Sequence, residues 1–302
     1  CSLSLFSESP EESEIDDVQA FKNLMTDLKS KSSIDLFALH YQSINDVIDS
    51  KSVLTKNDSI MISTALVYFT DPAIKGNASL VESYLNRGRQ LVISWISPTD
   101  GQTSFLRLRL PANWKPNMTY PLYVELHGLW SVADNPVDFM TYPFRRDPST
   151  SFSFEDGYLI LPWGRGNQWY QGISETDIME SIDVIEDLLS IDQRRKYLTG
   201  HSMGGFGTWY IACRTTDIWA AIGVHAGALW YGADYWLTDD KIEMMSEMPV
   251  YFGVGTSDGL YDINLSTYNR LLNAGNSNVK FVSFTGGHDY LGENVEDMYL
   301  WL

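Results

Sequence analysis

A serine between two glycines offers the clearest chemistry in this sequence. It is Ser202, the centre of a G-x-S-x-G pattern formed by Gly200, His201, Ser202, Met203 and Gly204. An apolar run precedes the pattern and a helix-like repeat follows it, which favours a nucleophile elbow over a chance match. At such a strand-to-helix turn the backbone is strained, and side chains two positions either side of the serine would collide. The glycines at both positions therefore support Ser202 as a nucleophile.

A serine hydroxyl needs a base to take its proton, and the sequence has five histidines. His288 follows the last predicted strand on a loop with two glycines, from which it can reach the carboxyl edge of a parallel sheet. The others are placed less well: His40 in a helical region, His127 at a strand end, His201 inside the elbow and His225 in an apolar run. The sequence therefore predicts His288 as the base.

The acid that orients this histidine is expected between the serine and the histidine, because the architecture uses the order Ser, Asp or Glu, His. Asp258 is the first carboxylate after an apolar strand that ends at Val254, and Asp262 lies four residues later. Residues at strand ends are held more firmly than residues further along a loop, which favours Asp258. Asp262 remains the alternative.

Two backbone N–H groups are expected to stabilise the oxyanion of an acyl-transfer reaction. The first belongs to Met203, the residue after the nucleophile. The second is predicted at Leu129, with Gly128 as the alternative, because that glycine lets the loop after a central strand approach a substrate. His127 is expected to brace this loop through hydrogen bonds.

Aromatic residues are frequent on the loops near the expected site, where flat apolar rings can stack on a sugar or a phenolic acid. Each is equally compatible with a place in the core. Trp130, Trp163 and Trp230 are the candidates for substrate binding. Arg165 is predicted to pair either with a substrate carboxylate or with a loop aspartate, and the second is favoured. The other loop aromatics are Trp169, Tyr170, Tyr231 and Trp236.

No cofactor or metal is predicted. The sequence has no H-E-x-x-H or C-x-x-C pattern, and Gly164 and Gly166 lack the helix start of a dinucleotide site. The formal net charge of −18, from 21 basic and 39 acidic residues, argues against nucleic acid or an anionic membrane surface as a partner. The expected partner is a small-molecule or oligosaccharide ester.

The elements that would position these groups begin at residue 90. Segments 91–96 and 104–110 predict a hairpin, and the apolar run 120–126 predicts a buried central strand. Strands then alternate with helices, which indicates an α/β fold with a mostly parallel sheet covered on both faces. Ser174, with Asp177 three residues on, is expected to cap the first helix. Further strands are predicted at 158–161, 197–199, 220–224, 249–254 and 279–284, and helices around 178–189, 206–213, 268–272 and 295–301. In the helix after the elbow, one apolar face is predicted to pack on the sheet; it consists of Phe206, Trp209, Tyr210 and Cys213.

The first 89 residues carry no catalytic pattern. Residues 1–14 predict a tether, and residues 15–89 predict a helical region that is compatible with a lid, a spacer or a dimer surface. A chain that begins at Cys1 and continues into a Ser- and Glu-rich tether is typical of a bacterial lipoprotein after signal-peptide cleavage, although an arbitrary boundary gives the same start. The expected location is extracytoplasmic, either in the cell envelope (periplasm or outer membrane) or secreted. Cys213 is the only other cysteine, so no disulfide framework is expected.

The motifs of residues 90–302 together resemble those of secreted bacterial α/β-hydrolases. Within that group the chain is similar to the prolyl-oligopeptidase-like predicted peptidases and esterases, which are related to feruloyl esterases and polyhydroxybutyrate depolymerases. The resemblance implies an α/β-hydrolase fold with a Ser-His-Asp triad and an N-terminal extension. The motifs that carry it are 126–128 (LHG), 164–167 (GRGN), Asp177, 200–209 (GHSMGGFGTW), 255–258 (GTSD) and 286–288 (GGH).

The resemblance leaves the substrate open, because the group contains both ester and peptide hydrolases. True prolyl oligopeptidases carry a propeller domain that is far too large for residues 1–89, which favours a serine carboxylesterase acting on carbohydrate or phenolic esters. A small-peptide hydrolase is the alternative. A third interpretation is a catalytically silent, carbohydrate-binding lipoprotein that has kept the fold.

Overall fold

The computed structural model describes residues 19, 20, 22 and 23, and residues 90–302 apart from 112–113, 116, 135–138, 140–156, 230–237 and 291. The chain divides into two compact units, Cys1–Tyr84 and Leu85–Leu302. The predicted tether, most of the predicted helical region and Trp230 lie outside the described residues. No helix within the described ranges is long and apolar enough to cross a membrane.

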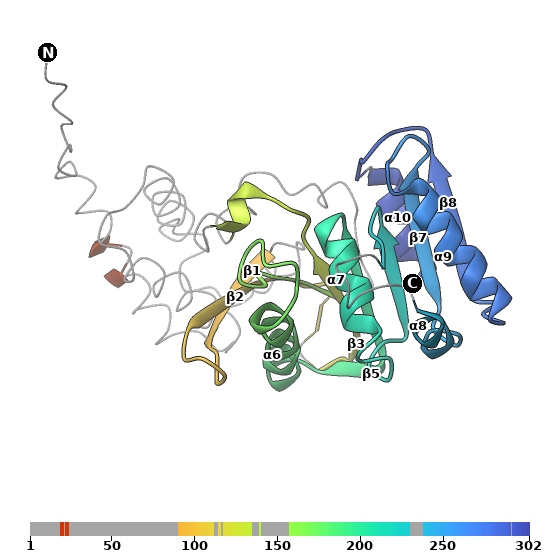
Figure 1. Ribbon diagram of the computed structural model, residues 1–302. Helices are drawn as coiled ribbons and strands as arrows, with labels where there is room; N and C mark the ends of the chain where they lie inside the picture. Colours follow the sequence, from red (N-terminus) through yellow and green to blue (C-terminus); the bar gives the residue numbers. More distant parts are fainter. Residues whose placement is uncertain are drawn as a thin grey trace, which may run out of the picture. The chain divides into compact units, whose positions relative to one another are not determined.

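A mostly parallel sheet runs through the second unit (Figure 1). Over the described residues it has eight strands in the order β1-β2-β4-β3-β5-β6-β7-β8. β1 pairs with β2, and β2 with β4, in antiparallel fashion, and all other neighbours are parallel. The predicted fold class is therefore confirmed. The strands are β1 (Gln90–Ile96), β2 (Thr103–Arg109), β3 (Tyr120–Leu126), β4 (Tyr158–Pro162), β5 (Ile191–His201), β6 (Ala221–His225), β7 (Val250–Gly255) and β8 (Val279–Phe284).

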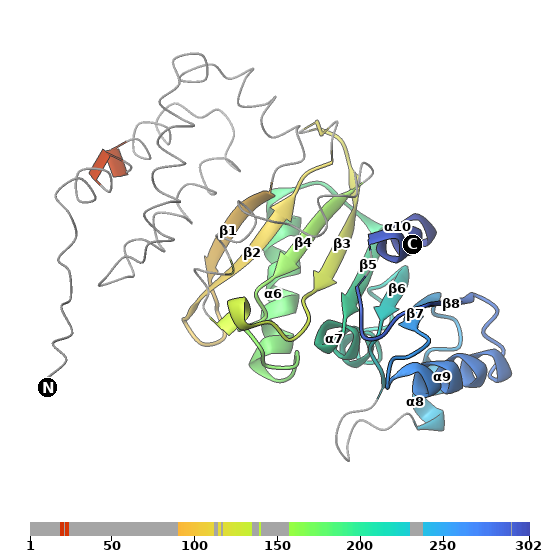
Figure 2. The ribbon, with the colours of Figure 1, turned by 90° about the horizontal axis from the view of Figure 1, so that it is seen from above.

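Helices cover both faces of this sheet (Figure 2). α6 (Ile173–Leu188), α7 (Met203–Ala212) and α9 (Tyr261–Asn273) lie on one face, and α10 (Gly292–Trp301) lies on the other. Consecutive residues of β7 show the alternation: Phe252 contacts Trp209 of α7, whereas Tyr251 contacts Trp301 of α10. The short helices η1 (Ser131–Asp134) and α8 (Asp239–Met244) complete the described elements.

Two local predictions for the helices are wrong. Ser174 does not cap α6, because the N-cap is Gly172 with φ 58°, and the Ser174 hydroxyl donates to the carbonyl of Gly164 at 2.5 Å. On α7, Phe206 and Tyr210 are only partly buried, although the apolar spacing predicted both on the core face. Small residues form much of the buried face instead, and a search for large apolar residues at helical spacing does not detect them. These small residues include Gly204, Gly205, Gly207, Thr208 and Ala212.

The elbow glycines are required by close backbone contacts. A Cβ on Gly200 would lie 2.5 Å from the carbonyl carbon of Gly204 and 2.8 Å from the carbonyl oxygen of Leu126. A Cβ on Gly204 would press on the Leu126 carbonyl and lie 2.9 Å from the carbonyl oxygen of His127. The glycines therefore let α7 begin directly against the end of β3.

We expect Gly204→Ala to lower the free energy of unfolding by about 4 kcal/mol or more, because the new methyl group meets the backbone of a central strand that cannot yield. Gly259→Ala is the matched control, since no atom lies within 4 Å of its would-be Cβ. Urea-induced unfolding of both variants measures the difference. Equal urea midpoints would contradict the prediction.

Candidate active site

The three residues predicted to form a triad meet at the carboxyl ends of parallel strands. Ser202 follows β5, Asp258 follows β7, and His288 follows β8. The Ser202 Oγ lies 2.7 Å from His288 Nε2, and the Asp258 Oδ2 lies 2.8 Å from His288 Nδ1. The side chains thus form one continuous hydrogen-bonded chain, the arrangement in which a hydroxyl can pass its proton to an imidazole.

Ser202 has the strained backbone that an elbow requires. Its φ of 56° and ψ of −119° place it in a region that residues with a side chain rarely adopt. The surrounding backbone holds it there: the Ser202 N–H donates to the His225 carbonyl at 2.9 Å, and the Ser202 carbonyl accepts from the Phe206 N–H at 3.0 Å. The hydroxyl therefore projects from a tightly fixed turn at the N-terminus of α7.

Geometry selects Asp258 over Asp262. The Asp258 residue is 8% exposed, and its Oδ1 accepts from the Leu260 N–H at 2.9 Å while Oδ2 faces His288. Asp262 is exposed in the first turn of α9. The hydrogen bond to His288 therefore belongs to the residue nearer the strand end.

The loop of His288 lies against the end of β7. A Cβ on Gly255 would lie 2.6 Å from the carbonyl oxygen of Gly286, so only glycine permits this approach. The Ser257 N–H then donates to that same carbonyl at 2.8 Å. These contacts carry the imidazole to Asp258, while the His288 side chain stays 44% exposed and open to water.

The loop after β3 passes beside the nucleophile. A Cβ on Gly128 would lie 3.5 Å from the Ser202 Cβ. The Trp130 N–H donates to Asn167 Oδ1 at 3.0 Å and is therefore engaged within the protein. Of the N–H groups in this loop, those of Leu129 and Gly128 remain the candidates for the oxyanion, together with that of Met203 at the start of α7.

His127 braces this loop, as predicted. Its Nδ1 lies 2.8 Å from the Gly128 carbonyl oxygen and its Nε2 lies 3.0 Å from that of Trp163. The Tyr170 hydroxyl donates to the His127 carbonyl at 2.8 Å. Burial lowers the pKa of His127, which favours the neutral ring. Because a neutral imidazole has one N–H, it donates to one of the two carbonyls at a time.

The residues predicted to bind substrate lie in several environments. The Trp163 Nε1 donates to the Ala133 carbonyl at 2.8 Å, so its polar edge is engaged within the protein. Trp130 is partly exposed, and its ring packs edge-on against Phe139. Tyr170, one of the other loop aromatics, is fully buried.

Arg165 pairs with two aspartates. Its Nε lies 2.8 Å from Asp177, its Nη2 lies 3.1 Å from Asp100, and its side chain is 10% exposed. Of the two roles that the sequence left open, the geometry therefore agrees with the structural one. A role for Arg165 in substrate binding stays a prediction.

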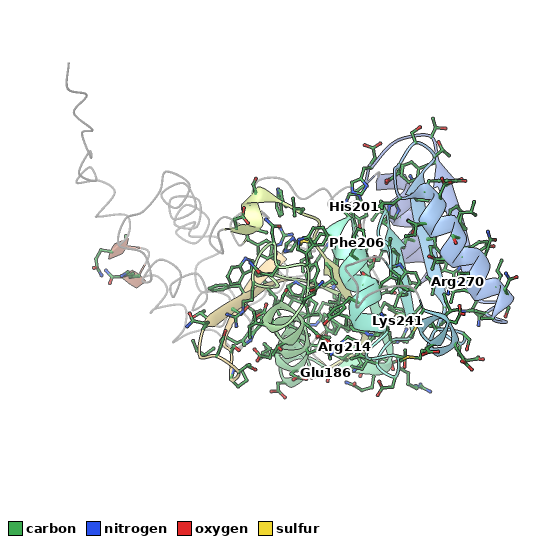
Figure 3. All side chains as sticks on the ribbon, in the orientation of Figure 1. Glu186, His201, Phe206, Arg214, Lys241 and Arg270 are labelled. Atoms are coloured by element: carbon green, nitrogen blue, oxygen red, sulfur yellow. The ribbon has the colours of Figure 1, made fainter. Side chains whose placement is uncertain are left out.

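Two further rings, those of His201 and Tyr290, lie near His288 and were not predicted as part of the site. The ring of His201 stacks on Tyr290, with centroids 4.9 Å apart, and lies 5.0 Å from the ring of His288. Figure 3 places His201 and Phe206 at the same end of α7, with Arg214 at the other end. Burial lowers the pKa of His201 to about 4, which keeps it neutral beside the triad.

A buried carboxylate lies on the far side of Tyr290. Glu125 Oε1 accepts from the Tyr290 hydroxyl at 3.3 Å, and Oε2 accepts from the Tyr299 hydroxyl at 2.5 Å. Glu125 is 8% exposed on the central strand β3. A single charged residue in an otherwise apolar strand was the one sequence signal that pointed to this contact.

Among the described residues, no group of three or more His, Cys, Asp or Glu is arranged to hold a metal ion.

Comparison with known proteins agrees with this architecture. Residues 162–295 match a family model described as "Putative esterase". The fluorophosphonate-binding serine hydrolase F of Staphylococcus aureus is 19% identical, with a TM-score of 0.54 over 70% of this chain and 97% of that chain. The CE1 ferulic acid esterase of Anaeromyces mucronatus is 17% identical, with a TM-score of 0.52 over 70% and 88%.

A thermostable esterase is also similar, at 19% identity and a TM-score of 0.49, but the match covers 70% of this chain and only 58% of that protein. At these identities, the two structures with TM-scores of 0.54 and 0.52 show the shared fold alone. That fold is the α/β-hydrolase fold. The match to the esterase family model, which covers residues 162–295, supports a serine hydrolase of the carboxylic ester type.

Proposed function

We propose that this chain is a carboxylesterase that works through an acyl-enzyme, with Ser202 as nucleophile, His288 as base and Asp258 as the group that orients the imidazole. The observation that carries the proposal is the chain of two hydrogen bonds, 2.7 Å from Ser202 Oγ to His288 Nε2 and 2.8 Å from His288 Nδ1 to Asp258 Oδ2. The order Ser, Asp, His along the sequence supports it.

In the first half of the reaction, Ser202 Oγ attacks the carbonyl carbon of the ester while its proton moves to His288 Nε2. The carbonyl oxygen becomes an oxyanion, which the N–H groups of Met203 and Leu129 stabilise. When the tetrahedral intermediate collapses, His288 returns the proton to the departing alkoxide. The products of this half are an alcohol and an acylated Ser202.

In the second half, water attacks the acyl-serine and gives its proton to His288 Nε2. The second collapse releases a carboxylic acid, and the proton returns to Ser202 Oγ. The 44% exposure of the His288 side chain supports this step, because water must reach the imidazole from the solvent side. Asp258 holds the ring in the tautomer that leaves Nε2 free to accept a proton in both halves.

The surroundings of the nucleophile favour an ester with an apolar or aromatic part, such as a phenolic ester of a carbohydrate. Leu129 is 63% exposed in the loop that passes Ser202, so its apolar side chain is available for contact. Phe206, one turn into α7, packs edge-on against Trp169 at 5.8 Å between ring centroids. Such apolar and aromatic surfaces suit a sugar ring or a phenolic acid.

The proposal is tested by comparing three substrates under one set of conditions: nitrophenyl acetate, a feruloyl ester and a peptide anilide. We expect hydrolysis of the esters, with kcat/KM at least about tenfold above that for the anilide, which is a gap of about 1.4 kcal/mol in transition-state stabilisation. Preference for the anilide would establish a peptide hydrolase instead. Failure to hydrolyse any of the three, with no labelling by a fluorophosphonate, would identify a protein that has kept only the fold.

A further inference from the structure

A single side-chain amide holds the backbone of the loop that carries Leu129. Asn167 Oδ1 accepts from the Trp130 N–H at 3.0 Å, and Asn167 Nδ2 donates to the Trp130 carbonyl at 3.0 Å. Nδ2 also donates to Asp134 Oδ1 at 2.6 Å. Both donor contacts require nitrogen at this position and the remaining contact requires oxygen, so the orientation of the amide is determined by its partners.

The two peptide planes on either side of Leu129 meet at its Cα and have different partners. The plane that joins Gly128 to Leu129 contains the Gly128 carbonyl, which lies 2.8 Å from His127 Nδ1. The next plane contains the Trp130 N–H, which Asn167 holds. Because a peptide unit is planar and trans, the Leu129 N–H points opposite to the Gly128 carbonyl, and the torsions at Leu129 link its direction to the plane that Asn167 holds.

Asn167 is itself held on a constrained loop. Arg165 has φ 59° and Gly166 has φ 80°, and the Gly166 N–H donates to the Trp163 carbonyl at 3.1 Å. The Arg165 guanidinium ties this turn to Asp177, whose side chain is fully buried. Backbone in sparsely populated regions persists only where its surroundings enforce it, so the loop presents the Asn167 amide in a fixed place.

We propose that Asn167 is a positioning residue that aims the Leu129 N–H at the oxyanion, acting through the backbone of Trp130. The inference rests on the proposed function, because it needs Leu129 to be an oxyanion donor. Such a donor is effective only when it is held in place before the charge develops. Asn167 does not touch the reacting atoms, and its effect appears in the stabilisation of the transition state.

Replacing Asn167 by alanine tests this. Loss of a whole oxyanion donor costs about 10² to 10³ in kcat, so a donor that is present but poorly aimed should cost about 10 to 10². We expect kcat for nitrophenyl acetate to fall by that factor with little change in KM. The inhibition constant of a trifluoromethyl ketone, which adds to the serine and forms an oxyanion, should rise by the same factor as kcat/KM falls.

Asn276→Ala is the matched control. Asn276 lies on the loop that precedes β8, and its buried amide also holds backbone: Nδ2 donates to the carbonyls of Met245 at 2.9 Å and Met248 at 2.7 Å. This variant should lose stability while kcat and ketone inhibition stay at the wild-type values. Asn167→Asp, which keeps the shape and one acceptor but loses both donors, supplies a second variant if the alanine variant does not fold.

The results distinguish a failure of the positioning role of Asn167 from a failure of the proposed esterase function. If the wild type hydrolyses the ester and binds the ketone, but the Asn167 variants match it in kcat and in inhibition constant, the positioning role is overturned. A rise in KM with unchanged kcat overturns it as well, because that pattern marks uniform substrate binding. If the wild type neither hydrolyses the ester nor binds the ketone, the proposed function fails, and the inference fails with it.

Discussion

Ser202→Ala is expected to lower kcat/KM for an ester by about 10⁶-fold, to the rate that binding and the oxyanion donors alone sustain. The reason is that the hydroxyl 2.7 Å from His288 Nε2 supplies the attacking oxygen, which alanine lacks. Initial rates with nitrophenyl acetate measure the loss. Labelling by a fluorophosphonate should disappear in the same variant.

Ser283→Ala controls for the loss of a hydroxyl, since Ser283 is exposed on β8. The double variant Ser202→Ala, His288→Ala should be no slower than Ser202→Ala alone, because a base without its nucleophile contributes nothing. Labelling that persists in Ser202→Ala, or a further large loss in the double variant, would contradict the assignment of Ser202 and His288 to one unit.

Much of this site follows from the sequence because its parts are set by local rules. Gly200 and Gly204 are dictated by backbone contacts at a tight turn, and the chain order of the triad is a property of the architecture. The bounds of β3 and β8 coincide with the predicted segments, since both are short apolar runs between polar turns. Such signals require no knowledge of distant contacts.

The missed features depend on contacts between distant parts of the chain. β5 begins at Ile191, six residues before the predicted start. The prediction missed these residues because the stretch 192–196 is mostly charged, and its pairing with β3 cannot be read from the sequence. Asn167 and Trp130 are 37 positions apart, and nothing in either residue type announces that one holds the other. Arg165 likewise finds Asp100 across 65 positions. Side chains with several possible partners are assigned only when the fold brings one of them near.

The second large effect is expected for Asp258→Asn, which should lower kcat by about 10³ to 10⁴ while the folded structure is kept. Asp258 Oδ2 accepts from His288 Nδ1 at 2.8 Å, which leaves the lone pair on Nε2 to receive the serine proton. An amide that presents its NH₂ group to Nδ1 favours the other tautomer, in which Nε2 already carries the proton. The ring then cannot act as a base, so the loss appears in kcat measured with nitrophenyl acetate.

Asp262→Asn is the matched control, because it removes the same charge four residues away on the exposed first turn of α9. It should leave kcat unchanged and alter stability by only a few tenths of a kcal/mol through the helix dipole. A loss of kcat in Asp262→Asn with full activity in Asp258→Asn would transfer the orienting role to Asp262. That result would also require the loop from Gly255 to Leu260 to rearrange in the working enzyme, because the 2.8 Å contact with His288 belongs to Asp258.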